Sequence, residues 1–153
     1  MREACLFLLF IVVMFSFGCG EKAEKPEEVK PFVPPSDGKI RAEQKDAYIK
    51  ASTALEEAMG KYSLKIKDFV EKHKVNPDLS QMSDTAFMNS HPVIKKAWDE
   101  LNEEWNIMQN EAYKIADITE EEFNWIGGAL TDSINTVIQK EVEKALSPIT
   151  EKE

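Results

Sequence analysis

Apolar side chains recur alternately three and four residues apart along most of the chain beyond residue 40. That spacing places them on one face of an α-helix, so three such stretches and no strand pattern predict an all-α fold. The first stripe comprises Tyr48, Ser52, Leu55, Met59, Tyr62, Ile66, Phe69 and His73. The second comprises Ile94, Trp98, Leu101, Trp105, Met108, Ala112 and Ile115, and the third Phe123, Ile126, Gly127, Leu130, Ile134, Val137, Ile138, Val142 and Ala145.

Local signals bound the three predicted helices. Pro77 ends the first helix, and Pro92 suits the first turn of the second. Thr119 and Glu122 form a capping-box pattern at the start of the third helix, which Pro148 closes. Each of the three helices is therefore expected to be long.

The connections decide how these helices pack. Residues 116–118 form a link so short that the second and third helices must run antiparallel. We therefore predict an antiparallel three-helix bundle over residues 40–149. The longer loop at residues 74–90 is expected to hold a short helix, with Phe87 and Met88 capping one end of the core. The same coiled-coil-like heptads would equally support self-association, and the spacing alone leaves that alternative open.

Two adjacent glycines, Gly127 and Gly128, lie inside the third predicted helix, where they cost about 2 kcal/mol of helix stability. Counting outward from the connection places them opposite Met108 and close to Trp105. We therefore predict that a large side chain packs against the bare backbone there. A hinge or a close approach by a ligand is the alternative.

Two histidines are expected at one end of the bundle. His73 and His91 flank the long loop, which also carries Met82 and Met88. Imidazole and thioether ligands together suit copper, so these four side chains are candidate metal ligands. The competing interpretation is purely structural, because a histidine at a helix C-terminus is already favoured by the helix dipole.

Residues 4–17 form an almost unbroken apolar run that is shorter than a transmembrane helix needs to be and reads as an export signal. The last two residues of this run and the next two form the segment Ser16-Phe17-Gly18-Cys19. This segment resembles the lipobox of bacterial lipoproteins. The resemblance covers residues 1–19 only. It implies that residues 1–18 are removed and that Cys19 carries acyl chains such as palmitate, which fix the protein to a membrane.

Two other readings of this segment stay open: an ordinary cleaved secretory signal and an uncleaved N-terminal anchor. The lipoprotein reading places the protein in the cell envelope, facing the periplasm or the surface. Gly20 stands where an aspartate would retain a lipoprotein at the inner membrane, so the outer membrane is favoured over the inner. The only cysteines are Cys5 and Cys19, so the mature domain is expected to fold without a disulfide.

Residues 19–39 are rich in proline, glutamate and lysine and are predicted to form an extended linker between the lipid and the bundle. The segment Lys30 to Pro35 is alternatively a proline-rich recognition site. The formal net charge of −9 argues against nucleic acid as a partner.

No catalytic motif is present, because no nucleophile triad, phosphate-binding glycine loop or zinc spacing can be nominated. The sequence therefore favours a non-enzymatic envelope protein with a structural role or an unknown envelope protein as partner, and no cofactor. The alternatives are a periplasmic module that binds a metal or small ligand, and an enzyme or enzyme inhibitor.

Overall fold

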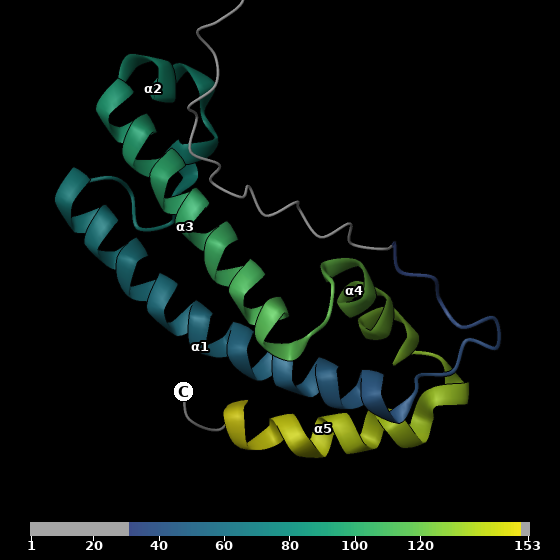
Figure 1. Ribbon diagram of the computed structural model, residues 1–153. Coiled ribbons are helices and arrows are strands. Elements are labelled where there is room, and N and C mark those ends of the chain that lie inside the picture. The colour runs from purple at the N-terminus through teal and green to yellow at the C-terminus, as the bar shows by residue number, and fades with distance from the viewer. Residues whose placement is uncertain (1–30, 151–153) are drawn as a thin grey trace, which may run out of the picture. The chain divides into compact units, whose positions relative to one another are not determined.

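The computed structural model describes residues 31–150, with side chains as far as Ser147. Every regular element in that part of the chain is helical, which confirms the all-α prediction (Figure 1). The α-helices are α1 (Ala42–His73), α2 (Thr85–Ser90), α3 (Pro92–Ala116), α4 (Glu120–Ala129) and α5 (Thr136–Thr150). Two short 3₁₀ segments are η1 (Ser80–Ser83) and η2 (Ser133–Asn135).

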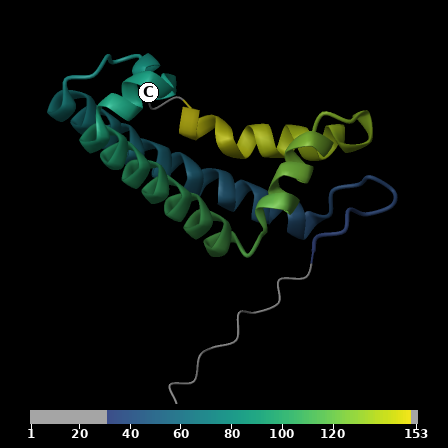
Figure 2. The same cartoon turned by 90° about the horizontal axis from the view of Figure 1, so that it is seen from above.

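Helix α1 is the central element, and it packs against α3, α4 and α5. It runs antiparallel to α3, and both views show α1 between α3 and α5 (Figures 1 and 2). Its end agrees with the prediction, since Lys74 takes the left-handed conformation with φ 54°. Of the predicted stripe, Phe69 is buried, whereas Met59 is 54% exposed. The stripe is therefore covered at its two ends and partly exposed between them, at Met59.

The loop between α1 and α3 contains the expected short helix α2. Asp84 begins it, because one of its carboxylate oxygens accepts hydrogen bonds from the backbone N–H groups of Ala86 and Phe87 at 2.8 and 3.2 Å. Met88 is buried and Phe87 is half-buried. These two side chains help to close the end of the hairpin as predicted.

The prediction of one long third helix is wrong, because this part of the chain forms two helices, α4 and α5. The chain leaves α4 at Ala129, and the hydroxyl of Thr131 donates to the carbonyl of Gly128 at 2.7 Å. Asp132 then caps η2 by accepting the N–H of Ile134 at 3.2 Å. Local hydrogen bonds thus replace the helical ladder over one turn, and α5 begins in a new direction (Figure 2).

The core divides into two clusters at opposite ends of α1. One joins α1 to the end of α3, to α4 and to α5, and its buried members are Ile40, Ala51, Tyr113, Ala116, Ile118, Ile126, Leu130 and Val142. The other lies beneath the loop that holds α2, and its buried members are Phe69, Val75 and Leu101. The hairpin of α1 and α3 connects the two clusters.

The folded unit begins at Phe32, before the predicted boundary at residue 40. The ring of Phe32 packs on Trp125 of α4 with the ring centroids 5.4 Å apart. Pro35 and Gly38 then form a turn in which the Gly38 N–H donates to the Pro35 carbonyl at 3.0 Å, with φ 66° at Gly38. Residues 32–39 therefore belong to the domain rather than to the predicted linker.

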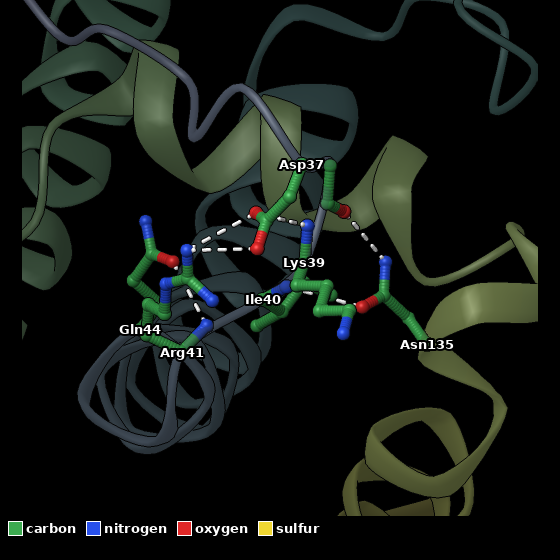
Figure 3. Close-up of polar contacts among 7 residues, drawn as sticks. Asp37, Lys39, Ile40, Arg41, Gln44 and Asn135 are labelled. Atoms are coloured by element: carbon green, nitrogen blue, oxygen red, sulfur yellow. Dashed lines mark hydrogen bonds and ion pairs between the residues drawn. The ribbon is translucent and has the colours of Figure 1, made fainter.

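Asn135 joins this N-terminal segment to the break between α4 and α5 (Figure 3). Its amide nitrogen donates to the carbonyls of Gly38 and Ala129, both at 3.0 Å. Its side-chain oxygen accepts the N–H of Ile40 at 3.0 Å. The residue is only 2% exposed, so one buried amide satisfies three backbone groups from two distant parts of the chain.

The predicted signal peptide at residues 1–18 and the lipidation site Cys19 lie outside the described residues. Within residues 31–150, no helix combines the length and the apolarity that a membrane crossing requires.

Candidate functional site

Two shallow grooves run along one side of the α1–α3 hairpin. The groove of about 100 Å³ is lined by Ala54, Glu57, Ala58, Lys61, Met108, Glu111, Ala112 and Ile115. The groove of about 240 Å³ is lined by Lys65, Asp68, Phe69, Lys72, His73, Ala97, Glu100, Leu101 and Glu104. No lining residue comes from α4 or α5. We call the surface formed by these residues the hairpin face.

The two sides of the hairpin face differ in charge. Helix α3 contributes three glutamates and no cation. Helix α1 contributes three lysines and two acidic residues, Glu57 and Asp68. One ion pair crosses the hairpin, with Nζ of Lys65 2.7 Å from Oε2 of Glu104 and both side chains about half exposed. Such an exposed pair adds little to the stability of the fold.

The candidate metal ligands act mainly in packing. The His73 ring lies 4.9 Å from the ring of Phe69. The His91 ring stacks on Phe87 at 4.2 Å, and its Nδ1 lies 2.9 Å from the Phe87 carbonyl oxygen. Each ring therefore packs on a phenylalanine, and Nδ1 of His91 already has a hydrogen-bond partner.

The two methionines of the same candidate site contact the apolar core. Met88 is 8% exposed, and Met82 packs on the cluster of Phe69, Val75 and Leu101. Across residues 31–150, no three or more His, Cys, Asp or Glu side chains gather where they could hold a metal ion. The geometry thus gives the candidate copper site no support beyond its residue types.

A large side chain does lie beside Gly127, but it is Tyr48 rather than Trp105 or Met108. A Cβ atom at Gly127 would lie 3.6 Å from the Tyr48 hydroxyl oxygen, and one at Gly128 would meet nothing within 4 Å. Trp105 instead packs on Tyr62 with centroids 5.0 Å apart, and Met108 lines a groove. The prediction misplaced the partner because α4 turns toward α1 instead of continuing along α3.

We expect Gly127→Ala to stabilise the protein by about 0.5–1 kcal/mol, since alanine is the better helix former and an added methyl meets Tyr48 at an ordinary contact distance. Urea unfolding followed by circular dichroism measures this change. Gly38→Ala is the control with the opposite sign, because φ there is 66° and a side chain would be strained. A loss of stability in Gly127→Ala would instead favour a role for the glycine as a hinge.

The titratable groups with perturbed pKa values lie away from the hairpin face. The Lys39 backbone N–H, and then the Arg41 guanidinium, hold the pKa of Asp37 below its usual value. A hydrogen bond from Lys45 to Glu141 raises the pKa of that lysine. Burial raises the pKa of the half-buried Tyr62 and of Tyr113. These shifts arise mainly from hydrogen bonds and burial, and none of these side chains lines either groove.

No protein-family model, curated protein or solved structure matches this chain. Its function therefore has to be argued from its own residues. The sequence gives no local signal for the hairpin face, because only the fold brings the lysines of α1 beside Glu100 and Glu104 of α3 and leaves this side uncovered.

Proposed function

We propose that this chain is a membrane-anchored, non-enzymatic helical lipoprotein of the cell envelope that mediates a protein interaction or has a structural role. The observation that carries the proposal is the apolar run at residues 4–17, whose last two residues and the next two form Ser16-Phe17-Gly18-Cys19. In this proposal Cys19 becomes the first residue of the mature protein and carries the lipid. Several acyl chains make such an anchor effectively permanent, because each buried CH₂ contributes about 0.8 kcal/mol.

The start of the folded unit sets the length of the proposed tether. Because Phe32 already packs on Trp125, only residues 20–31 are left to connect the anchor to the domain. At about 3 Å per extended residue, this segment would span at most ~35 Å. The domain would then act close to the membrane, where its partners share the same envelope compartment.

The hairpin face supports the interaction role. It exposes 58% of Ile115 beside a row of carboxylates, and no other described element covers it. Its grooves are too small and too open to enclose most substrates, since typical ligand sites measure about 300–1,000 Å³. A flat helical surface with mixed charge is better suited to another protein than to a small molecule.

The proposal is tested by replacing Cys19 with serine in the full chain. We expect the natural chain to be found in the membrane fraction, with an intact mass that includes diacylglycerol and begins at Cys19. The Cys19→Ser variant should lose this lipid and the lipid-dependent membrane attachment. Cys5→Ser is the matched control, because it removes the other thiol inside the apolar run and should leave lipidation unchanged.

Two outcomes would contradict the proposed lipid anchor on Cys19. A Cys19→Ser variant that stays in the membrane fraction would favour an uncleaved N-terminal anchor. A natural chain that is cleaved at another residue and carries no lipid would favour an ordinary secretory signal.

A further inference from the structure

We propose that the hairpin face binds a second copy of this chain, so that α1 of each copy lies on α3 of the other in a symmetric dimer. This inference rests on the interaction role proposed above and names its partner. It is carried by three properties of the face: its shape, its charge and the symmetry that these two permit.

The shape provides a projecting side chain and a shallow place to receive one. Ile115 on α3 lines the smaller groove and is 58% exposed. The groove beside Ile115 has a floor of small side chains, Ala54, Ala58 and Ala112. An exposed isoleucine and an alanine-lined groove are complementary, as knobs and holes are in packed helices.

The charges on the two helices have the same spacing and opposite sign. Helix α1 places lysines at 61, 65 and 72, and α3 places glutamates at 100, 104 and 111, so each row has intervals of four and seven residues. The ion pair between Lys65 and Glu104 shows that these two residues lie at one level along the hairpin. Because the helices are antiparallel, Lys72 then lies level with Ala97, and Lys61 with Met108. Glu100 and Glu111 each lie three residues, about 4.5 Å along α3, from the level of a lysine, which is within reach of its side chain.

Most of these charges have no partner across their own groove. Of the three neighbouring lysine–glutamate pairs, only Lys65–Glu104 closes. Within the described part of the chain Lys61, Lys72 and Glu111 make no ion pair. Glu100 contacts Lys96 of its own helix at 3.6 Å. A second copy would bring a lysine row to each glutamate row and so provide the missing partners.

Symmetry selects one arrangement. Dimer interfaces with twofold symmetry use the same patch on both copies, and the axis can lie parallel or perpendicular to the hairpin. A perpendicular axis would place the three α3 glutamates of one copy against those of the other. A parallel axis places α1 on α3 at unchanged levels. It therefore brings Ile115 to the level of Ala54 of the partner, and Lys61 to within three residues of the level of the partner's Glu111.

The remaining charged residues of the face agree with this choice. Glu57 and Asp68 reduce the α1 row to a net charge of +1, from three lysines and two carboxylates, whereas the α3 row stays at −3. The α1 row of one copy, with net charge +1, attracts the α3 row of the other, with net charge −3, which favours packing of α1 on α3. Two α3 rows, each with net charge −3, repel each other, which disfavours packing of α3 on α3. The parallel axis also places both N-terminal segments at the same end of the dimer, as two copies anchored in one membrane require.

The test is sedimentation of the full chain in mild detergent at concentrations up to ~100 μM, with Ile115→Lys as the variant. We expect the natural chain to form dimers, and Ile115→Lys to weaken dimerisation at least about tenfold, the effect of removing one well-packed interface residue. Val137→Lys on α5 is the matched control, because Val137 is 70% exposed and does not line the hairpin face. Circular dichroism checks that both variants keep their helix content.

A charge exchange tests whether acidic rows pair with basic rows across the dimer. One chain carries Lys61→Glu, Lys65→Glu and Lys72→Glu, and a second carries Glu100→Lys, Glu104→Lys and Glu111→Lys. Each alone should be monomeric, and an equal mixture should form dimers, because each acidic row then meets a basic one. Dimers of either chain alone, or no dimers in the mixture, would overturn the arrangement.

The remaining outcomes separate this inference from the proposed function. A natural chain that stays monomeric to the highest concentration would overturn the dimer. If that monomer still carried lipid on Cys19, the anchor would stand. If an envelope protein co-purified with the natural chain and was lost in Ile115→Lys, the face would serve a different partner, and the dimer would likewise be wrong.

Discussion

Replacing Asn135 with alanine is expected to lower the free energy of unfolding by about 2–4 kcal/mol. The alanine variant would leave the Ile40 N–H and the carbonyls of Gly38 and Ala129 without their side-chain partner. Each such hydrogen bond contributes about 1 kcal/mol net, and an unsatisfied buried group costs about 1–3 kcal/mol. Water reaching part of the vacated site would keep the total toward the lower end of the range. Urea unfolding followed at 222 nm measures the change.

The matched control is Asn124→Ala, in which an exposed asparagine of α4 is removed. Its stability should stay within about 0.5 kcal/mol of the natural chain. Hydrogen exchange gives an independent readout, because the Ile40 amide should exchange faster in Asn135→Ala than in the control. Equal stability in the two variants would show that the N-terminal segment docks without this amide.

The first two helices could be predicted closely because their apolar stripes end at clear local signals. Pro77 lies just past α1, and Pro92 is the first residue of α3. No comparable signal closes α4 within the third stripe, since the three- and four-residue spacing continues unbroken through Ile134 and Val137. In the structure these two side chains are 49% and 70% exposed. Spacing alone could not show that the chain changes direction between them.

The break depends on residues whose effect is partly long-range. Thr131 and Asp132 are turn formers, and they were the available sign that the helix ends there. The more conspicuous Gly127 and Gly128 lie within α4, which continues past both. Asn135 stabilises the break through Gly38, a residue 97 positions away, and no local pattern predicts such a contact.

The boundary of the linker was misjudged for a related reason. Pro34 and Pro35 predict an extended chain, and an extended chain can either remain solvated or lie against a domain. Phe32 and its contact with Trp125 decide between these possibilities. A single aromatic residue in a proline-rich segment is weak evidence until its partner on α4 is known.

The hairpin face was equally hidden, because its parts are informative only together. Lys61 and Glu111 are separated by fifty residues, and each reads as an ordinary solvated charge. They form a surface because α5 packs on the opposite side of α1, where Lys45 contacts Glu141 at 2.7 Å.

Replacing Ile126 with alanine is expected to lower the free energy of unfolding by about 3–4 kcal/mol. Ile126 is 0% exposed and is the largest fully buried side chain among the described residues. It lies in the cluster that joins α4 to α1 and α5, so its truncation removes apolar contacts with several elements at once. Isoleucine-to-alanine changes in cores cost about 2–5 kcal/mol, and a site shared by several helices collapses poorly around a cavity.

Graded variants distinguish a cavity effect from a general loss of helix stability. Ile126→Val removes one methylene and should cost about 0.5–1.5 kcal/mol. Ile134→Ala is the control, because Ile134 is 49% exposed and its truncation should cost less than 1 kcal/mol. Urea unfolding at 222 nm gives all three values. If Ile126→Ala cost no more than Ile134→Ala, α4 would not be held by this cluster, and the break between α4 and α5 would rest on Asn135 alone.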